Sequence, residues 1–181
     1  AMPAGEVWHD AAAMLVSAAN SFDAPLDDRA AAAMVQQFRV RTAAFPTGTT
    51  FSGMIIADAL ARSGRAAEAG ALVEELLRFA HAHDERVVES ALVSARAALL
   101  VESDPAAAPV AYLEAIALAR KISARALELR AALGLAKLWR GSEQRTAALE
   151  HLAAAVAPFT EGFDMPDLVE AKRLLDVTTS R

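Results

Sequence analysis

The residues of this chain that could do chemistry are few, and the densest group of them is His81, His83 and Asp84. Imidazole and carboxylate groups are zinc ligands, so these residues are candidates for a metal site. Two residues at i and i+2 of a helix point to different sides, so His81 and His83 do not converge on one ion. Histidine also interacts favourably with the dipole at the C-terminal end of a helix. We therefore expect a solvated helix end here and no bound metal.

A second candidate is the glycine-containing segment RSGRAAEAG at residues 62–70. A phosphate-binding loop needs a lysine followed by serine or threonine after its last glycine, and this segment has neither. Its position between two apolar segments favours a hairpin turn instead. No serine–histidine–acid set stands out, and the absence of cysteine excludes disulfides, thiolate zinc sites and cysteine nucleophiles. We therefore expect no catalysis and no cofactor.

The composition predicts an all-α protein. The chain of 181 residues is 55% hydrophobic but only 6% aromatic, and much of its apolar content is alanine, the best helix former. No alternation of apolar and polar residues is long enough for a strand. No uncharged apolar run approaches the roughly 18–20 residues of a membrane span. A net charge of −5 argues against direct nucleic acid binding. Together with the missing cysteines, these features favour a cytoplasmic location.

Apolar positions at helical spacing predict nine helices within one domain covering residues 1–181. Asp104 is expected to cap the sixth helix, with Pro105 in its first turn, and Gly64 is expected to end the third. Residues 1–2 are interpreted as the remnant of a cleaved tag. The predicted helices cover residues 6–20, 27–45, 50–63, 66–83, 85–101, 105–122, 124–140, 143–157 and 167–177. They form hairpins over about 6–45, 49–83, 85–122 and 124–157, followed by a closing helix over 165–177.

An internal repeat links three of these hairpins. Their second helices align at a spacing of 40 residues, with apolar or small residues at shared positions. Such agreement is typical of stacked hairpins, because each hairpin buries its apolar face only against its neighbours. The matching triples are Ala69, Pro109 and Leu149; Leu72, Tyr112 and Leu152; and Leu76, Ile116 and Val156.

The pattern AxxLxxxGxxxxA resembles the tetratricopeptide repeat, with Ala57, Leu60, Gly64 and Ala69 at its positions. The period of 40 residues exceeds the usual length of about 34. The second repeat also departs from the pattern, because Asp104 replaces the glycine and a proline replaces the last alanine. The resemblance implies a tetratricopeptide-like α-solenoid, a right-handed superhelix of about four hairpins with a C-terminal capping helix.

The end of the chain carries a more specific resemblance. Residues 159–175, FTEGFDMPDLVEAKRLL, are similar to the closing segment of a family of large bacterial signalling proteins. That family combines a cyclase-like or DNA-binding module, a P-loop ATPase of the STAND type and a C-terminal tetratricopeptide-like array. Residues 62–77 and 104–119 fit the same array, whereas the first 45 residues fit only as a degraded hairpin. The resemblance implies a regulatory array without catalytic residues.

The same resemblance implies a binding groove. In tetratricopeptide arrays the first helix of each hairpin lines the concave surface, which suits a helix or an extended apolar segment. Trp139 has an alternative interpretation, in which it packs under the closing turn against Phe159 or Phe163. The predicted groove residues are Met54, Asp58, Ser94, Ala98, Ala132, Ala136 and Trp139.

The two ends of the array are expected to differ. Phe159, Phe163 and Leu168 are predicted to seal the last hairpin, since a terminal repeat otherwise exposes an apolar face. The N-terminal face near Val7, Trp8 and Leu15 has no evident cap, which predicts a homo-oligomer or an upstream neighbour. Charge is also uneven, because residues 1–28 contain no lysine or arginine, whereas residues 120–145 contain seven. Docking of a partner, head-to-tail association and simple solvation all remain open as explanations.

These observations leave three functional hypotheses. The favoured one is a non-catalytic scaffold that binds a protein or peptide, or upstream domains of the same polypeptide, within a bacterial signalling protein. The alternative is a repeat domain that senses a small inducer and controls an attached ATPase or cyclase. An enzyme unrelated to the family is the third. We expect no membrane and no nucleic acid among the partners.

Overall fold

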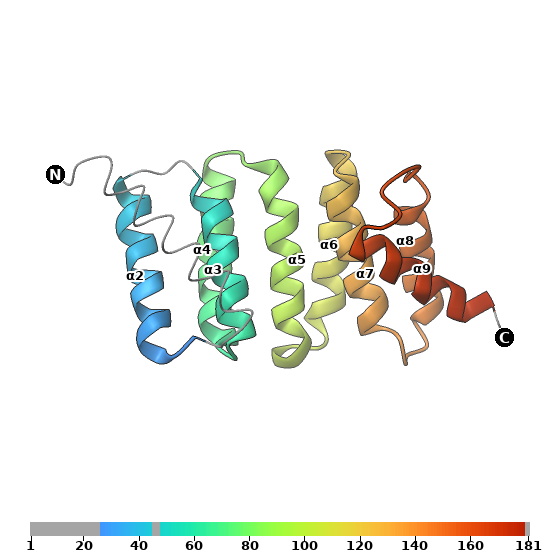
Figure 1. Cartoon of the computed structure of the whole chain (residues 1–181), viewed down its shortest axis with the longest axis horizontal. Helices are drawn as coiled ribbons and strands as arrows, with labels where there is room; N and C mark the ends of the chain where they lie inside the picture. The colour runs from blue at the N-terminus through green and yellow to red at the C-terminus, as the bar shows by residue number, and fades with distance from the viewer. Residues whose placement is uncertain (1–25, 45–47, 180–181) are drawn as a thin grey trace. The chain divides into compact units, whose positions relative to one another are not determined.

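A computed structural model describes residues 26–44 and 48–179, and all regular structure in these ranges is helical. The all-α prediction is thus confirmed for the described part, whereas the helix predicted at residues 6–20 lies outside it. None of the described helices combines the length and apolar character needed to cross a membrane. The helices are α2 (Asp28–Ala44), α3 (Thr49–Arg62), α4 (Ala66–Ala82), α5 (Arg86–Ser103), α6 (Ala107–Lys121), α7 (Arg125–Leu138), α8 (Arg145–Val156) and α9 (Pro166–Thr179) (Figure 1).

The helices begin and end where the sequence carries caps and breakers. The carboxylate of Asp27 accepts the N–H of Ala30 at 2.7 Å, and that of Asp104 accepts the N–H of Ala107 at 3.1 Å. Both aspartates therefore cap the first turn of a helix, as predicted for Asp104. Gly64 ends α3 with φ +77°, a left-handed conformation that glycine adopts without steric cost.

Two further helices end in left-handed residues that are not glycine. Ser123 follows α6 and Asp84 follows α4, and each has φ +56°. After α6, the N–H of Ser123 donates to Arg120 O at 3.0 Å and the N–H of Ala124 donates to Ala119 O at 2.9 Å. This pair of bonds defines a Schellman motif, in which glycine is the preferred residue. Both turns therefore adopt a glycine-type conformation without a glycine.

The chain divides into two compact units, Ala1–Asp84 and Glu85–Arg181. In the described part of the first unit, α3 and α4 form a hairpin and α2 packs on α3. A β-carbon added at Gly53 of α3 would lie 2.7 Å from Leu76 Cδ1 and 3.0 Å from Phe38 Cζ. Because these distances are shorter than van der Waals contact, Gly53 allows α3 to approach its two neighbours closely. The largest fully buried side chains here are Phe38, Ile56, Leu60, Leu72, Leu76 and Val73.

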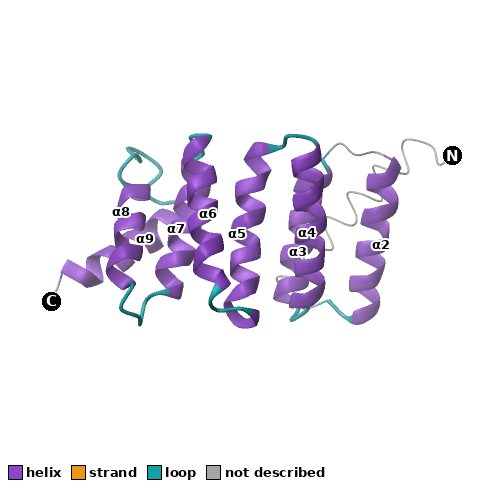
Figure 2. Ribbon diagram, turned by 180° about the vertical axis from the view of Figure 1, so that it is seen from behind, coloured by secondary structure: helices purple, strands orange, loops and turns teal. Residues whose placement is uncertain are grey.

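The second unit contains five helices, drawn from green to red in Figure 1 and from behind in Figure 2. Successive helices pack on one another, α7 also contacts α5, and α9 also contacts α7. Within this unit, α7 thus touches both helices of the hairpin before it, and the closing helix α9 touches both helices of the hairpin formed by α7 and α8. This arrangement within the unit is compatible with an α-solenoid. Its largest fully buried side chains are Leu92, Ile116, Leu129, Leu135, Leu152 and Leu168.

The predicted repeat positions lie mostly in these cores. Leu72, Tyr112 and Leu152, which form one triple of the 40-residue repeat, are all buried. Pro109 and Leu149, from another triple, are only half-buried. The 40-residue spacing therefore identified core-facing positions of the second helices. The extent of burial differs between equivalent positions.

Candidate functional site

The histidine group lies at the end of α4 and is turned onto its own helix. His83 Nδ1 lies 2.8 Å from Phe79 O, and the two rings stack with centroids 3.9 Å apart. His81 is exposed in the last turn of the same helix. Among the residues that the structure describes, no group of three histidine, aspartate or glutamate side chains could hold a metal. The group therefore occupies the solvated helix end that the sequence predicted.

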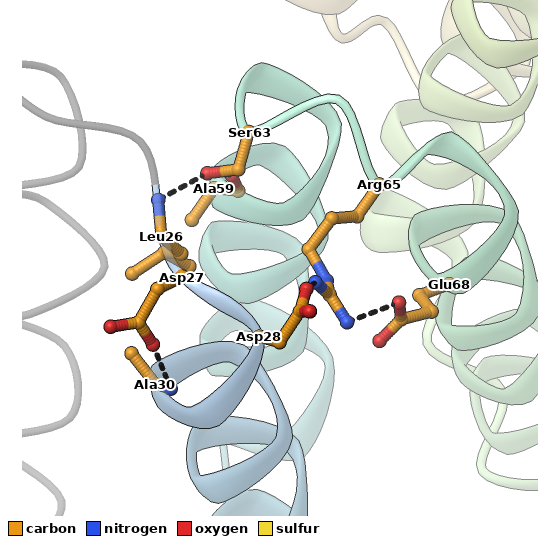
Figure 3. Close-up of polar contacts among 8 residues, drawn as sticks. All are labelled: Leu26, Asp27, Asp28, Ala30, Ala59, Ser63, Arg65 and Glu68. Carbon is orange, nitrogen blue, oxygen red and sulfur yellow. Dashed lines mark hydrogen bonds and ion pairs between the residues drawn. The ribbon is translucent and has the colours of Figure 1, made fainter.

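Within the segment 62–70, residues 63–65 form the predicted turn between α3 and α4, and the segment also contacts the start of α2 (Figure 3). The guanidinium of Arg65, whose side chain is 18% exposed, pairs with Asp28 of α2 and with Glu68 of α4, the latter at 2.6 Å. The hydrogen bond to Asp28 is the main cause that raises the pKa of Arg65 above its ordinary value. Leu26 N–H also donates to Ser63 Oγ at 2.8 Å. These contacts give the segment a structural role in joining three helices.

The predicted groove residues do not form a common open surface within the second unit. Ser94 is half-buried and Ala98 is exposed, but Ala132 is 0% and Ala136 is 4% exposed. Buried side chains cannot contact a partner, so neither alanine of α7 can line a groove in this structure. The reason is that α7 packs against α5, α6, α8 and α9, and small residues allow these close approaches. The exposed residues of α7 include Ala126, Arg130 and Lys137.

The other two predicted groove residues, Met54 and Asp58, belong to α3 in the first unit. Met54 is half-buried, whereas Asp58 is exposed and pairs with Arg62 one turn later at 2.9 Å. Such an exposed pair contributes little stability and leaves the carboxylate accessible. The groove as a whole remains a prediction.

Trp139 lies at the end of α7 that is remote from the closing turn. It is half-buried, and its carbonyl accepts the N–H of Ser142 at 3.1 Å. The closing turn starts near the other end of α7, where Arg125 Nη1 donates to Pro158 O at 3.1 Å. The 14 residues of α7 separate these ends by about 21 Å. Phe159 follows Pro158 directly, so the interpretation that Trp139 packs against Phe159 is wrong, because α8 runs antiparallel to α7 and places the start of the turn at the other end. Packing of Trp139 against Phe163 stays a prediction.

The closing helix α9 covers the last hairpin. Leu168 and Ala171 are 0% exposed, and α9 packs on both α7 and α8. Two ion pairs attach it to α7, Arg130–Asp167 at 3.3 Å and Lys137–Glu170 at 2.9 Å. The prediction that Leu168 seals this end is confirmed.

Phe163, which was also predicted to seal the last hairpin, does not do so. Its side chain remains 47% exposed, and Lys172 Nζ lies 3.8 Å from the centre of its ring. The apolar surface of the last hairpin is therefore covered by Leu168 and Ala171 of α9 and not by Phe163 of the preceding turn. The exposed ring becomes part of the outer surface of the unit.

Four of the seven basic residues at 120–145 make contacts within the second unit. Arg120 pairs with Glu128 at 2.5 Å, and Arg125 donates to a backbone carbonyl. Arg130 and Lys137 pair with the two acidic residues of α9 described above. Three of these cations, Arg120, Arg130 and Lys137, are therefore paired with acidic side chains of α7 and α9.

Sequence reasoning missed two features. The first unit contains a cavity of about 260 Å³ between α2, α3 and α4, lined by Phe38, Arg39, Thr42, Ala43, Thr49, Glu75, Leu76 and Phe79. The second unit exposes Phe163, Met165 and Val169 near the start of α9. Apolar periodicity assigns such residues to a core, and no pattern in the sequence distinguishes a residue that lines a cavity from one that fills it.

Comparison with known proteins adds no identity. No family model, curated protein or solved structure matches this chain. The similarity of residues 159–175 to bacterial signalling proteins therefore remains a prediction from the sequence.

Proposed function

We propose that this chain is a non-catalytic scaffold of the tetratricopeptide-like type that binds a protein or peptide. We further propose that it regulates a multidomain bacterial signalling protein of the STAND class. The observation that carries this proposal is the packing in the second unit, where α7 contacts both α5 and α6 and α9 contacts both α7 and α8. A packing relation that repeats along the chain is the basis of binding surfaces in solenoid proteins.

The partner we propose is a helix or an extended apolar segment that docks on α5. Ala98 is exposed on this helix and Ser94, one turn earlier, is half-buried. Small side chains on a helix surface let a second backbone approach closely, which is how helix-in-groove binding begins. In this proposal the docking surface is therefore centred on Ala98, away from the buried alanines of α7.

The test is peptide selection followed by affinity measurement. Peptides selected from a display library against the intact protein are labelled, and their Kd is measured by fluorescence anisotropy. We expect Ala98→Glu to weaken binding at least about tenfold, because it buries a charge under the ligand. Ala117→Glu places the same charge at an exposed position of α6 and should leave the Kd unchanged. Equal effects of the two substitutions, or no selected peptide, would contradict the proposal.

A second candidate function is the sensing of a small ligand, and the cavity of the first unit favours it. Phe38 and Leu76 are each 1% exposed and give the cavity an apolar floor. Arg39 and Glu75 pair at 3.2 Å beside it, with side chains 53% and 39% exposed. An apolar floor with one cation and one anion at the rim suits a small zwitterion with an apolar side chain.

Calorimetric titration with apolar amino acids tests this second function. Binding that is lost in Arg39→Gln and retained in Arg29→Gln, an exposed position of the same helix, would support it. Absence of heat with every amino acid in the panel would remove the hypothesis. Because the cavity and Ala98 belong to different units, each result is independent of the peptide experiment.

A further inference from the structure

The outer face of α9 carries apolar side chains that are exposed and do not pack in the core. Val169 is 51% exposed and Met165, just before the helix, is 38% exposed. Val169 N–H donates to Met165 O at 3.0 Å, so Met165 is in helical register with α9. Arg173 follows Val169 by four residues and is exposed. Residues four apart lie on one helix face, so Met165, Val169 and Arg173 form a continuous outward stripe.

The two ends of this stripe carry opposite charges. Glu161 and Asp164 are exposed in the turn before α9, and Arg173 is exposed in its second half. Between them, Lys172 lies over the exposed ring of Phe163 at 3.8 Å. The face is therefore acidic at its beginning and apolar in its middle, and its second half carries the cation of Arg173, followed by the exposed Asp176.

This face is also held in position before any partner arrives. The opposite side of α9 buries Leu168 and Ala171 completely. The ion pairs of Asp167 and Glu170 with α7 hold the first half of the helix. A surface that is ordered in the free protein loses less conformational entropy on association.

We propose that the outer face of α9 binds the same face of a second copy of this chain in a two-fold symmetric dimer. A two-fold contact uses one patch twice, so the patch must be complementary to itself. If two α9 helices run antiparallel with Val169 of each copy at the axis, Arg173 of one copy lies opposite Met165 of the other, beside Asp164. The pairing of Arg173 of one copy with Asp164 of the other, which occurs twice around the axis, satisfies this requirement. The contact is separate from the peptide surface of the proposed function.

Sedimentation equilibrium of the intact protein over a range of concentrations tests the dimer. We expect a monomer–dimer equilibrium whose Kd rises at least about tenfold in Val169→Asp, since the charge would be buried at the axis. Val110→Asp is the matched control, because Val110 on α6 is 66% exposed and lies outside the stripe. It should leave the Kd unchanged, and circular dichroism checks that both variants retain their helices.

Charge exchange tests the antiparallel arrangement itself. Asp164→Arg and Arg173→Asp should each weaken the dimer, because each places like charges opposite one another. The double variant restores opposite charges and should recover the original Kd within about threefold. A monomer at all concentrations, an open series of larger oligomers, equal effects of Val110→Asp and Val169→Asp, or failure of the double variant to recover would overturn the proposal.

Discussion

Gly134 of α7 lies directly against the phenol ring of Tyr112 on α6. A β-carbon at position 134 would lie 2.7 Å from Tyr112 Cζ and 2.9 Å from its hydroxyl oxygen. Tyr112 is 7% exposed, and α6 and α7 pack closely against each other. The missing side chain at Gly134 therefore provides the space that the only tyrosine of the chain occupies.

Substitution of Gly134 should reveal this contact. We expect Gly134→Ala to lower the free energy of unfolding by about 1–3 kcal/mol, the usual cost of overpacking a core, despite the higher helix propensity of alanine. The measurement is urea denaturation followed by circular dichroism. Gly70→Ala is the control, because Gly70 is also within a helix but a β-carbon there meets no atom within 4 Å. That substitution should stabilise the protein by about 1 kcal/mol.

Tyr112 should also make stability depend on alkaline pH. Burial raises the pKa of its phenol above the ordinary value, because the charged form is poorly solvated. The phenol of Tyr112 ionises near pH 10 in the unfolded chain and only at higher pH in the folded protein. The contribution of the neutral phenol to the free energy of unfolding is thus fully present below the pKa of the unfolded state. It is lost as the pH rises through the pKa of the folded state.

Two measurements check this pH dependence. Ultraviolet absorbance should place the tyrosine titration of the folded protein above that of the protein in urea. Tyr112→Phe should show a smaller loss of stability above about pH 10 than the unsubstituted protein. Coincident titrations in the folded and unfolded states would disprove the effect.

Replacing Ser123, the left-handed residue after α6, by glycine should stabilise the protein. Serine at φ +56° has a steric cost of about 1 kcal/mol that glycine avoids. We therefore expect Ser123→Gly to raise the free energy of unfolding by roughly that amount, measured by thermal denaturation. Ser123→Ala keeps the β-carbon and should give no gain. Asp84→Gly should give a smaller gain, since aspartate tolerates this conformation better than serine.

The closing helix should depend on one buried side chain. Leu168→Ala should destabilise the protein by about 2–4 kcal/mol, because Leu168 is 0% exposed against α7 and α8. Asp176→Ala, at an exposed position of the same helix, should change stability by less than about 0.5 kcal/mol. Hydrogen exchange should show faster exchange of amides in α9 in the first variant only.

Most helix boundaries could be predicted to within one or two residues because local residues determine them. The carboxylate of Asp104 accepts a hydrogen bond from the first residue of α6, whatever that helix packs against. Gly64 likewise supplies the left-handed residue that ends α3. Pro105, predicted in the first turn of α6, lies two residues before the helix, which begins at Ala107.

The side chains of the candidate site were less predictable, because their exposure depends on how helices pack. An alanine that lines an open groove and an alanine that allows two helices to touch have the same sequence pattern, so Ala132 and Ala136 could not be assigned. Trp139 ends α7 as predicted, but whether its side chain meets a residue of the closing turn depends on where that turn lies across the hairpin, which local sequence does not determine. Phe163 was predicted to seal the last hairpin, but Leu168 and Ala171 of α9 fill that position and Phe163 stays exposed.

The close packing at Gly53 has a consequence for the evolution of this sequence. Phe38 of α2 and Leu76 of α4 both occupy space that a side chain at position 53 would need. A relative with a larger residue at position 53 should therefore carry a smaller residue at position 38, at position 76, or at both. These three positions, which lie far apart in the sequence, are expected to change together as lineages diverge, and each constrains the substitutions that the other two can accept.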